Sequence, residues 1–139
     1  MVAAESVTAG GVATALAAAG EASEWFSGSI VAYRTATKRE LLGVESDAVI
    51  SHRCAREMAE GALRLTGADL VVSVTGVGGP DSEEGEPPGT VIICAGQRDD
   101  LRVFDHSFTG PPEQVVRQAT LQALRHLKDA TLALNGVSS

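Results

Sequence analysis

The feature that most constrains the fold is a nearly continuous apolar run at residues 70–74, Leu-Val-Val-Ser-Val. A strand with one face in water alternates apolar and polar residues, whereas this largely β-branched run is typical of a central strand covered on both faces. The chain must therefore supply helices for both faces of a sheet. It is 44% hydrophobic but only 4% aromatic, so we expect a core of alanine, valine, leucine and isoleucine.

Strand-like and helix-like segments alternate along the rest of the chain. Strands are predicted at residues 2–4, 28–33, 90–95 and 101–108, and helices at 8–19, 35–42, 51–65 and 112–134. The glycine- and proline-rich segment 76–89 is predicted to be a loop, and the last two strands to pair antiparallel. This order predicts one α/β domain over residues 1–139, a three-layer α/β/α arrangement with a mixed, mostly parallel central sheet.

Charge and composition argue against several classes of partner. The net charge of −7 and the pI near 4.8 oppose binding to nucleic acid or to an anionic membrane surface. No apolar run reaches the roughly 18 residues that a membrane helix needs, so we expect a cytoplasmic protein without nucleic-acid or membrane partners. Cys54 and Cys94 are expected to be reduced, buried thiols.

Three polar or glycine-rich clusters follow predicted strands. They are Glu-Ser-Val-Thr-Ala-Gly-Gly at residues 5–11, Tyr33 with Lys38 five residues later, and Thr-Gly-Val-Gly-Gly-Pro at residues 75–80. Ligands of open α/β sheets collect at the carboxyl ends of the strands. We therefore expect the three clusters to contribute to one site.

Ser6 is a candidate nucleophile because it stands between a strand and a helix N-terminus, where free backbone N–H groups can stabilise an oxyanion or a phosphate. Gly10 and Gly11 would let a ligand approach the backbone closely. A purely structural alternative is that Ser6 or Thr8 only caps the following helix.

Lys38 is one of only two lysines, and it could act as a general base if burial or a neighbouring positive charge, such as Arg34 or Arg39, lowers its pKa. The alternative is an exposed helical lysine. Tyr33 could relay a proton or orient the serine, or it could be a core residue with a satisfied hydroxyl. A serine, a lysine and a tyrosine together suffice for amide hydrolysis without histidine.

No metal and no cofactor is expected. The 75–80 segment lacks the Lys-Ser/Thr of a Walker loop and the G-x-G-x-x-G spacing, so it either binds a phosphate or amide or is only a structural turn. The three histidines, His52, His106 and His126, lie far apart in the sequence, and neither cysteine stands near another ligand type. The acidic residues of the 76–89 loop are predicted to be solvated.

Five ordered blocks resemble the CinA C-terminal domain family, which includes the PncC-type nicotinamide-nucleotide amidases. The blocks are Ala-Glu-Ser-Val-Thr-Ala-Gly-Gly at 4–11, Gly-Ser-Ile-Val-Ala-Tyr at 28–33 followed by Lys38 and by Leu-Gly-Val at 42–44, Gly-Ala-Asp at 67–69, Val-Thr-Gly-Val-Gly-Gly-Pro at 74–80, and Pro-Gly-Thr-Val at 88–91. The resemblance covers nearly the whole chain.

This resemblance implies hydrolysis of nicotinamide mononucleotide to nicotinate mononucleotide and ammonia. It implies that Ser6 is the nucleophile, Lys38 its general base, and Tyr33 an orienting or proton-relaying group. The substrate-binding residues that it implies are Thr75, Gly76, Gly78 and Gly79 around the pocket, and Thr8, Gly10 and Gly11 as donors to substrate oxygen or phosphate.

The chain departs from the family pattern in two places. Family members generally have a helix and a complete first strand before the Ala-Glu-Ser block, so we expect both to be truncated here. Arg34 follows Tyr33 where the family often has serine, and it could either change the specificity or attract the substrate phosphate to an otherwise acidic protein. The alternative function is a non-catalytic nucleotide-binding or regulatory domain of the same fold. We also expect a homodimer, with the alanine-rich segment 12–19 buried against a second copy.

Overall fold

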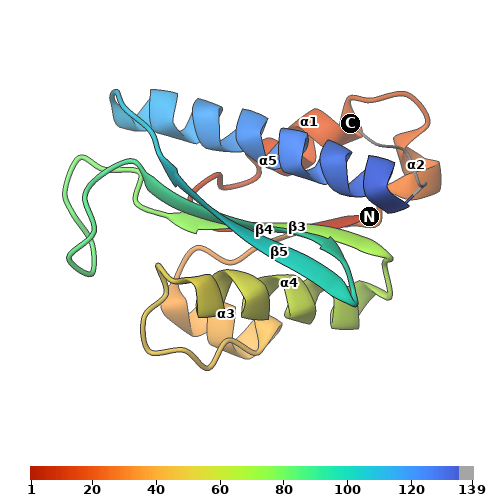
Figure 1. The fold of residues 1–139 in the computed structure, drawn as a ribbon, viewed down its shortest axis with the longest axis horizontal. Helices are drawn as coiled ribbons and strands as arrows, with labels where there is room; N and C mark the ends of the chain where they lie inside the picture. Colours follow the sequence, from red (N-terminus) through yellow and green to blue (C-terminus); the bar gives the residue numbers. More distant parts are fainter. Residues whose placement is uncertain (135–139) are drawn as a thin grey trace.

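The structure, a computed structural model that describes residues 1–134, is a five-stranded sheet between two layers of helices (Figure 1). The strands are β1 (Val2–Glu5), β2 (Gly28–Val31), β3 (Leu70–Gly76), β4 (Thr90–Gln97) and β5 (Asp100–Ser107). The helices are α1 (Gly11–Ala17), α2 (Ala22–Trp25), α3 (Thr35–Leu42), α4 (His52–Thr66) and α5 (Pro112–Leu134). One face of the sheet is covered by α1, α2 and α5, and the other by α3 and α4 (Figure 1). The predicted three-layer arrangement is confirmed.

The sheet is mixed, with the strand order β2-β1-β3-β4-β5. β1 pairs parallel with both β2 and β3, whereas β4 pairs antiparallel with both β3 and β5. Only β4 therefore runs against the other four strands, as the prediction of a mostly parallel sheet requires. β3 lies in the middle, and all its residues but the last are buried, which confirms the reading of the 70–74 run.

The two faces of the sheet carry separate hydrophobic clusters. Along β3, Val71 packs into the cluster with α4, whereas Val72 and Val74 pack into the cluster with α1 and α5. Gly61 of α4 meets α3 at very close range, since a Cβ atom there would overlap the carbonyl oxygen of Leu42. The missing side chain lets the two helices lie against each other.

Both cysteines belong to the cluster on the α4 face. Cys54 and Cys94 are free and buried, which confirms the prediction of reduced thiols. Burial raises the pKa of Cys54 to about 11 and that of Cys94 to about 12. Both thiols are therefore uncharged at neutral pH.

Several element boundaries differ from the sequence prediction. α1 begins at Gly11 rather than at residue 8, because residues 6–10 form turns and Gly10 takes a left-handed conformation with φ 101°. Neither Ser6 nor Thr8 caps α1, so the capping alternative is wrong. β2 ends at Val31 and is an edge strand with half-exposed residues, not a largely buried strand that reaches residue 33. The short helix α2 was not predicted.

Candidate active site

The carboxyl ends of β1, β2 and β3 open into a cavity of about 360 Å³. Eight residues predicted from the sequence line it, namely Ser6, Tyr33, Arg34, Lys38, Thr75, Gly76, Gly78 and Gly79. The topology thus brings together the three clusters that are far apart in the sequence. Sequence reasoning missed the remaining lining residues, which are Val7, Thr35, Ala36, Val49, Ile50 and Glu83.

Ser6 lies directly after β1 and is 6% exposed. Its backbone N–H donates to the carbonyl oxygen of Val74 at 3.0 Å, which fixes the residue against β3. Within residues 1–134 its hydroxyl makes no hydrogen bond to another protein group, and it is not a sealed, unsatisfied atom. The hydroxyl therefore faces the cavity and is free to meet a ligand.

Lys38 is another buried polar residue of the cavity, since it is 2% exposed on the inner face of α3. Its Nζ donates to the backbone carbonyl oxygen of Tyr33 at 2.8 Å. Burial lowers the pKa of Lys38, whereas the carboxylates of Glu83 and Glu84 partly oppose this shift. The exposed-lysine alternative is therefore wrong. Burial, rather than Arg34 or Arg39, is the cause of the lowered pKa.

Tyr33 stands at the rim of the cavity with 64% of its surface exposed. The alternative of a core tyrosine with a satisfied hydroxyl is therefore wrong. What the structure shows for this residue is a backbone role, because its carbonyl oxygen holds the Lys38 amine. Tyr33 also belongs to the lining of the cavity.

Glu5 is a fully buried carboxylate next to Ser6. It accepts five hydrogen bonds, from the hydroxyls of Thr8 (2.8 Å) and Ser29 (2.7 Å) and from the backbone N–H groups of Gly10 (3.2 Å), Val12 (2.8 Å) and Ala13 (3.0 Å). The N-terminal N–H groups of α1 thereby gain an acceptor, and β1 is tied to the edge strand β2. This role of Glu5 was not recognised from the sequence. The signal for it is that the first N–H groups of a helix need an acceptor and that Glu5 stands just before the start of α1.

The same contacts correct the predicted role of Thr8, Gly10 and Gly11. None of the three lines the cavity. The Thr8 hydroxyl and the Gly10 N–H donate to Glu5, and the Gly11 N–H donates to the Thr8 carbonyl oxygen at 2.9 Å. Because these donors serve the β1–α1 turn, they are not available to a substrate.

The third cluster, after β3, forms the opposite wall. The Thr75 hydroxyl donates to the carbonyl oxygen of Val49 at 2.8 Å, so Thr75 holds the wall and can offer a ligand only an acceptor. A Cβ atom on Gly76 would overlap the carbonyl oxygen of Thr90, so glycine is required there by the neighbouring β4. Within residues 1–134 the N–H groups of Gly78 and Gly79 donate to no backbone carbonyl, which leaves two donors beside the cavity.

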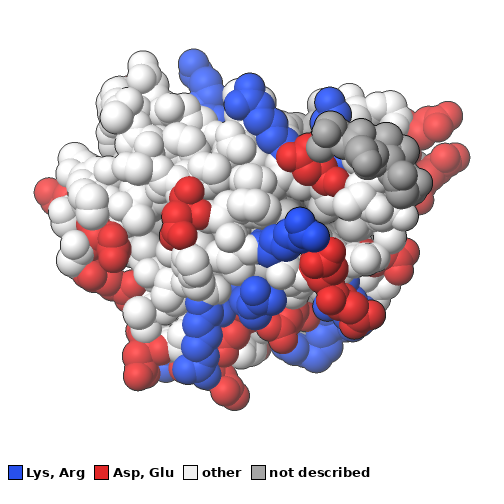
Figure 2. Space-filling view, in the orientation of Figure 1, with Lys and Arg blue, Asp and Glu red and all other residues white. Residues whose placement is uncertain are grey.

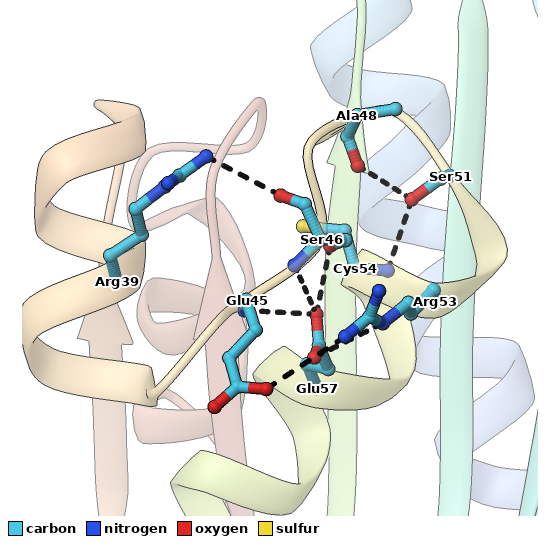
Figure 3. Close-up of polar contacts among 8 residues, drawn as sticks. All are labelled: Arg39, Glu45, Ser46, Ala48, Ser51, Arg53, Cys54 and Glu57. Carbon is cyan, nitrogen blue, oxygen red and sulfur yellow. Dashed lines mark hydrogen bonds and ion pairs between the residues drawn. The ribbon is translucent and has the colours of Figure 1, made fainter.

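The segment 43–51 supplies another wall and is fastened to α4 (Figure 3). One carboxylate oxygen of Glu57 accepts from the N–H groups of Glu45 (3.2 Å) and Ser46 (3.0 Å) and from the Ser46 hydroxyl (2.8 Å). Ser51 caps α4, because its hydroxyl accepts from the Cys54 N–H at 3.1 Å, and it donates to the carbonyl oxygen of Ala48 at 2.7 Å (Figure 3). This wall is therefore held in place before any ligand binds.

Glu84 fastens the same segment from the side of the 77–89 loop. Its carboxylate accepts from the N–H groups of Val49 at 3.0 Å and Ile50 at 2.7 Å. These contacts span 35 and 34 residues of sequence and close the cavity between two loops. The prediction that this acidic residue is only solvated is wrong, since its carboxylate binds backbone groups.

Acidic side chains lie on both sides of the face drawn in Figure 2. One group is at the left, where Figure 1 places the loop between β3 and β4, and another is at the lower right. Within residues 1–134 no group of three or more histidine, cysteine, aspartate or glutamate side chains could hold a metal ion. The histidines lie elsewhere, with His52 paired to Asp105 and with His106 and His126 in contact between β5 and α5.

In the described part of the chain, no helix combines the length and the apolarity needed to cross a membrane.

Comparison with known proteins identifies the family. The family described as the CinA C-terminal domain matches residues 1–131. A competence-damage inducible protein of Bacillus pumilus is 41% identical over 130 residues, which are 90% of this chain and 31% of that protein. A CinA-like protein of Thermotoga maritima is 35% identical over 131 residues, with 90% and 32% covered. The chain spans about a third of the length of these relatives.

Solved structures agree with this assignment. The competence damage-inducible protein A of Klebsiella pneumoniae has a TM-score of 0.88 at 33% identity, over 92% of this chain and 83% of that one. A CinA superfamily protein of Escherichia coli has a TM-score of 0.87 at 32% identity, over 91% and 77%. The chain therefore belongs to the CinA C-terminal domain family.

Proposed function

We propose that this chain is an amidase that hydrolyses nicotinamide mononucleotide to nicotinate mononucleotide and ammonia. The observation that carries the proposal is that Ser6 and Lys38 line the same cavity. The serine hydroxyl has no protein partner within residues 1–134, and the amine is buried, has a lowered pKa and is held by a single carbonyl oxygen. A nucleophile and a base that is uncharged more easily than usual are the two requirements of serine–lysine chemistry.

In the proposed reaction, Lys38 takes the proton of the Ser6 hydroxyl while Oγ attacks the carboxamide carbon. A neutral amine can donate one N–H to the Tyr33 carbonyl oxygen and still offer its lone pair to the serine. The proton is then delivered to the departing nitrogen, which leaves as ammonia, and an ester on Ser6 remains. Water activated by Lys38 hydrolyses this ester, releases the carboxylate and restores the hydroxyl.

The negative oxygen that forms on the carboxamide carbon needs donors in fixed positions. Gly78 and Gly79 line the cavity, their N–H groups donate to no backbone carbonyl of residues 1–134, and these groups are the candidates for this role. They replace Gly10 and Gly11, whose donors serve the fold.

The substrate phosphate is assigned to the start of α3. Arg34 precedes this helix, no side chain caps it, and Thr35 and Ala36 line the cavity. The first N–H groups of a helix lack partners within the helix and attract anions. A phosphate held there would leave the other end of the nucleotide to reach Ser6.

The direct test is ammonia release from nicotinamide mononucleotide by purified protein. Ser6→Ala and Lys38→Ala should each lower turnover by at least about a thousandfold. Lys128→Ala, which removes the other lysine on the exposed side of α5, is the matched control and should retain full turnover. Turnover that persists in Ser6→Ala would remove the proposed nucleophile.

The pH dependence is a second test of the same proposal. Activity should rise with pH as Lys38 loses its proton, and a flat profile between about pH 6 and 9 would contradict a lysine base. Binding of the nucleotide without turnover in the parent protein would instead support a regulatory domain.

A further inference from the structure

Glu83 is an acidic residue held at the mouth of the cavity by its own hairpin. Its N–H donates to the Glu86 carbonyl oxygen at 3.1 Å, and the Glu86 N–H donates back to the Glu83 carbonyl oxygen at 2.8 Å. The two residues between them, Glu84 and Gly85, have positive φ values of 53° and 78°, as a tight two-residue hairpin turn requires. The position of Glu83 is therefore fixed by backbone contacts.

The tip of this hairpin is anchored across the cavity. Glu84 binds the N–H groups of Val49 and Ile50, so the adjacent Glu83 cannot swing away with the loop. Within residues 1–134 the exposed side chain of Glu83 forms no ion pair and no hydrogen bond, and Glu83 lines the same cavity as Ser6 and Lys38. Its negative charge therefore stands, without a partner in that part of the chain, on the wall of a cavity that holds two buried reactive groups.

The cavity therefore carries charges of opposite sign on different elements, with Arg34 before α3 and Glu83 in the hairpin. A carboxylate at the mouth repels an anionic ligand, so it hinders a substrate that carries only a phosphate. It attracts a ligand that carries a positive charge near the amide. A pyridinium ring with a phosphate tail has both charges.

We infer that Glu83 selects substrates whose amide is attached to a cationic aromatic ring. This inference rests on the proposed function and deepens it, because it assigns the two ends of a zwitterionic nucleotide to two sides of the cavity. The anionic end lies at Arg34 and the cationic ring lies at Glu83. An amide on an uncharged ring gains nothing from this carboxylate.

The arrangement also links binding to the base. Glu83, Glu84 and the neutral thiol of Cys54 are the titratable neighbours of Lys38, and the two carboxylates raise its pKa against the effect of burial. A cationic ring beside Glu83 offsets that negative field and so favours the uncharged amine. The substrate would thereby help to prepare the base that attacks it.

The test compares nicotinamide mononucleotide with its reduced dihydropyridine form, which has the same phosphate and an uncharged ring. Dissociation constants are measured by calorimetry in a Ser6→Ala background, where the amide is not turned over. Glu83→Gln should weaken binding of the cationic form by about threefold to tenfold and leave binding of the reduced form within about twofold. Glu86→Gln, in the same hairpin but away from the cavity lining, is the matched control and should change neither.

The outcomes separate this inference from the proposed function. Equal weakening of both ring forms by Glu83→Gln, no weakening of either, or failure of both forms to bind would overturn the inference. Binding that depends on the ring charge, in a parent protein that releases no ammonia, would uphold the inference and end the proposal of an amidase. Release of ammonia with no preference for ring charge would uphold the proposal of an amidase and overturn the inference about Glu83.

Discussion

The β1–α1 junction and the β2–α3 junction each bury one charged side chain beside the same cavity, and they do so in opposite ways. Glu5 is fully buried and accepts five hydrogen bonds, two of them from hydroxyls and three from backbone N–H groups. Lys38 is almost as buried but has one hydrogen bond, to a backbone carbonyl oxygen. The Glu5 carboxylate is therefore fully hydrogen-bonded, whereas the Lys38 amine is not.

This difference separates structure from chemistry. A buried charge is stable only when hydrogen bonds replace its water, and Glu5 meets that condition with donors from β2, from α1 and from the turn before α1. Lys38 does not, so burial lowers its pKa and eases loss of the proton. The number of hydrogen-bond partners thus predicts that Glu5 serves the stability of the fold and that Lys38 serves the reaction.

The largest effect expected from this comparison is on activity. Lys38→Met should lower kcat/KM for nicotinamide mononucleotide by about a thousandfold, because the base is lost, while the free energy of unfolding stays the same or rises. Ammonia release and urea unfolding measure the two quantities. A variant that keeps its activity, or that unfolds much more readily, would place Lys38 with Glu5 as a structural group.

The next effect is on stability. Glu5→Gln should lower the free energy of unfolding by about 3 kcal/mol, because one carboxylate oxygen becomes an amide that faces donors instead of accepting from them. Urea unfolding measures the change, and Glu40→Gln on an exposed position of α3 is the control. A loss no larger than that of the control would mean that the five hydrogen bonds contribute little.

A smaller loss is expected when one donor of the same set is removed. Ser29→Ala should cost about 1 kcal/mol, because the Glu5 carboxylate keeps its other four partners. The same unfolding measurement applies. In combination with Glu5→Gln the two losses should fall short of their sum, since both remove the same contact, and strict additivity would show that they do not.

The smallest effect is a slope of stability with pH. The pKa of Lys38 in the folded state lies below its ordinary 10.5, so between the two values the unfolded chain binds more protons than the folded one. The free energy of unfolding contributed by this residue therefore rises with pH across that window and levels off above 10.5. Unfolding of the parent and of Lys38→Met at several pH values should show the rise only in the parent.

The sequence predicts local features of this molecule better than contacts between distant loops. The 70–74 run identified the central strand because an apolar, largely β-branched composition by itself indicates a strand that is buried on both faces. Ser6 and Lys38 were found because each follows a strand end, and strand ends converge in this topology. The start of α1 was misplaced because the acceptor for its N–H groups is Glu5, which lies outside the helix.

The parts of the cavity that were missed depend on pairing between loops. Val49 and Ile50 are held at the cavity by hydrogen bonds with Glu84 and Thr75, and no local pattern shows which carboxylate will meet which backbone N–H. Glu83 and Glu84 look alike in the sequence. Glu84 stands in the two-residue turn between Glu83 and Glu86 and reaches the neighbouring loop, whereas Glu83 stands before the turn and lines the cavity.

The close packing at Gly61 reaches further than the hydrophobic core. Leu42, whose carbonyl oxygen lies against that glycine, is one helical turn from Lys38, and both side chains are buried on the same side of α3. A methyl group at position 61 would push the helix outward and carry the amine with it, although the substitution lies on α4 and outside the cavity lining. The position of the Lys38 amine in the cavity thus depends on Gly61, a residue that does not line the cavity.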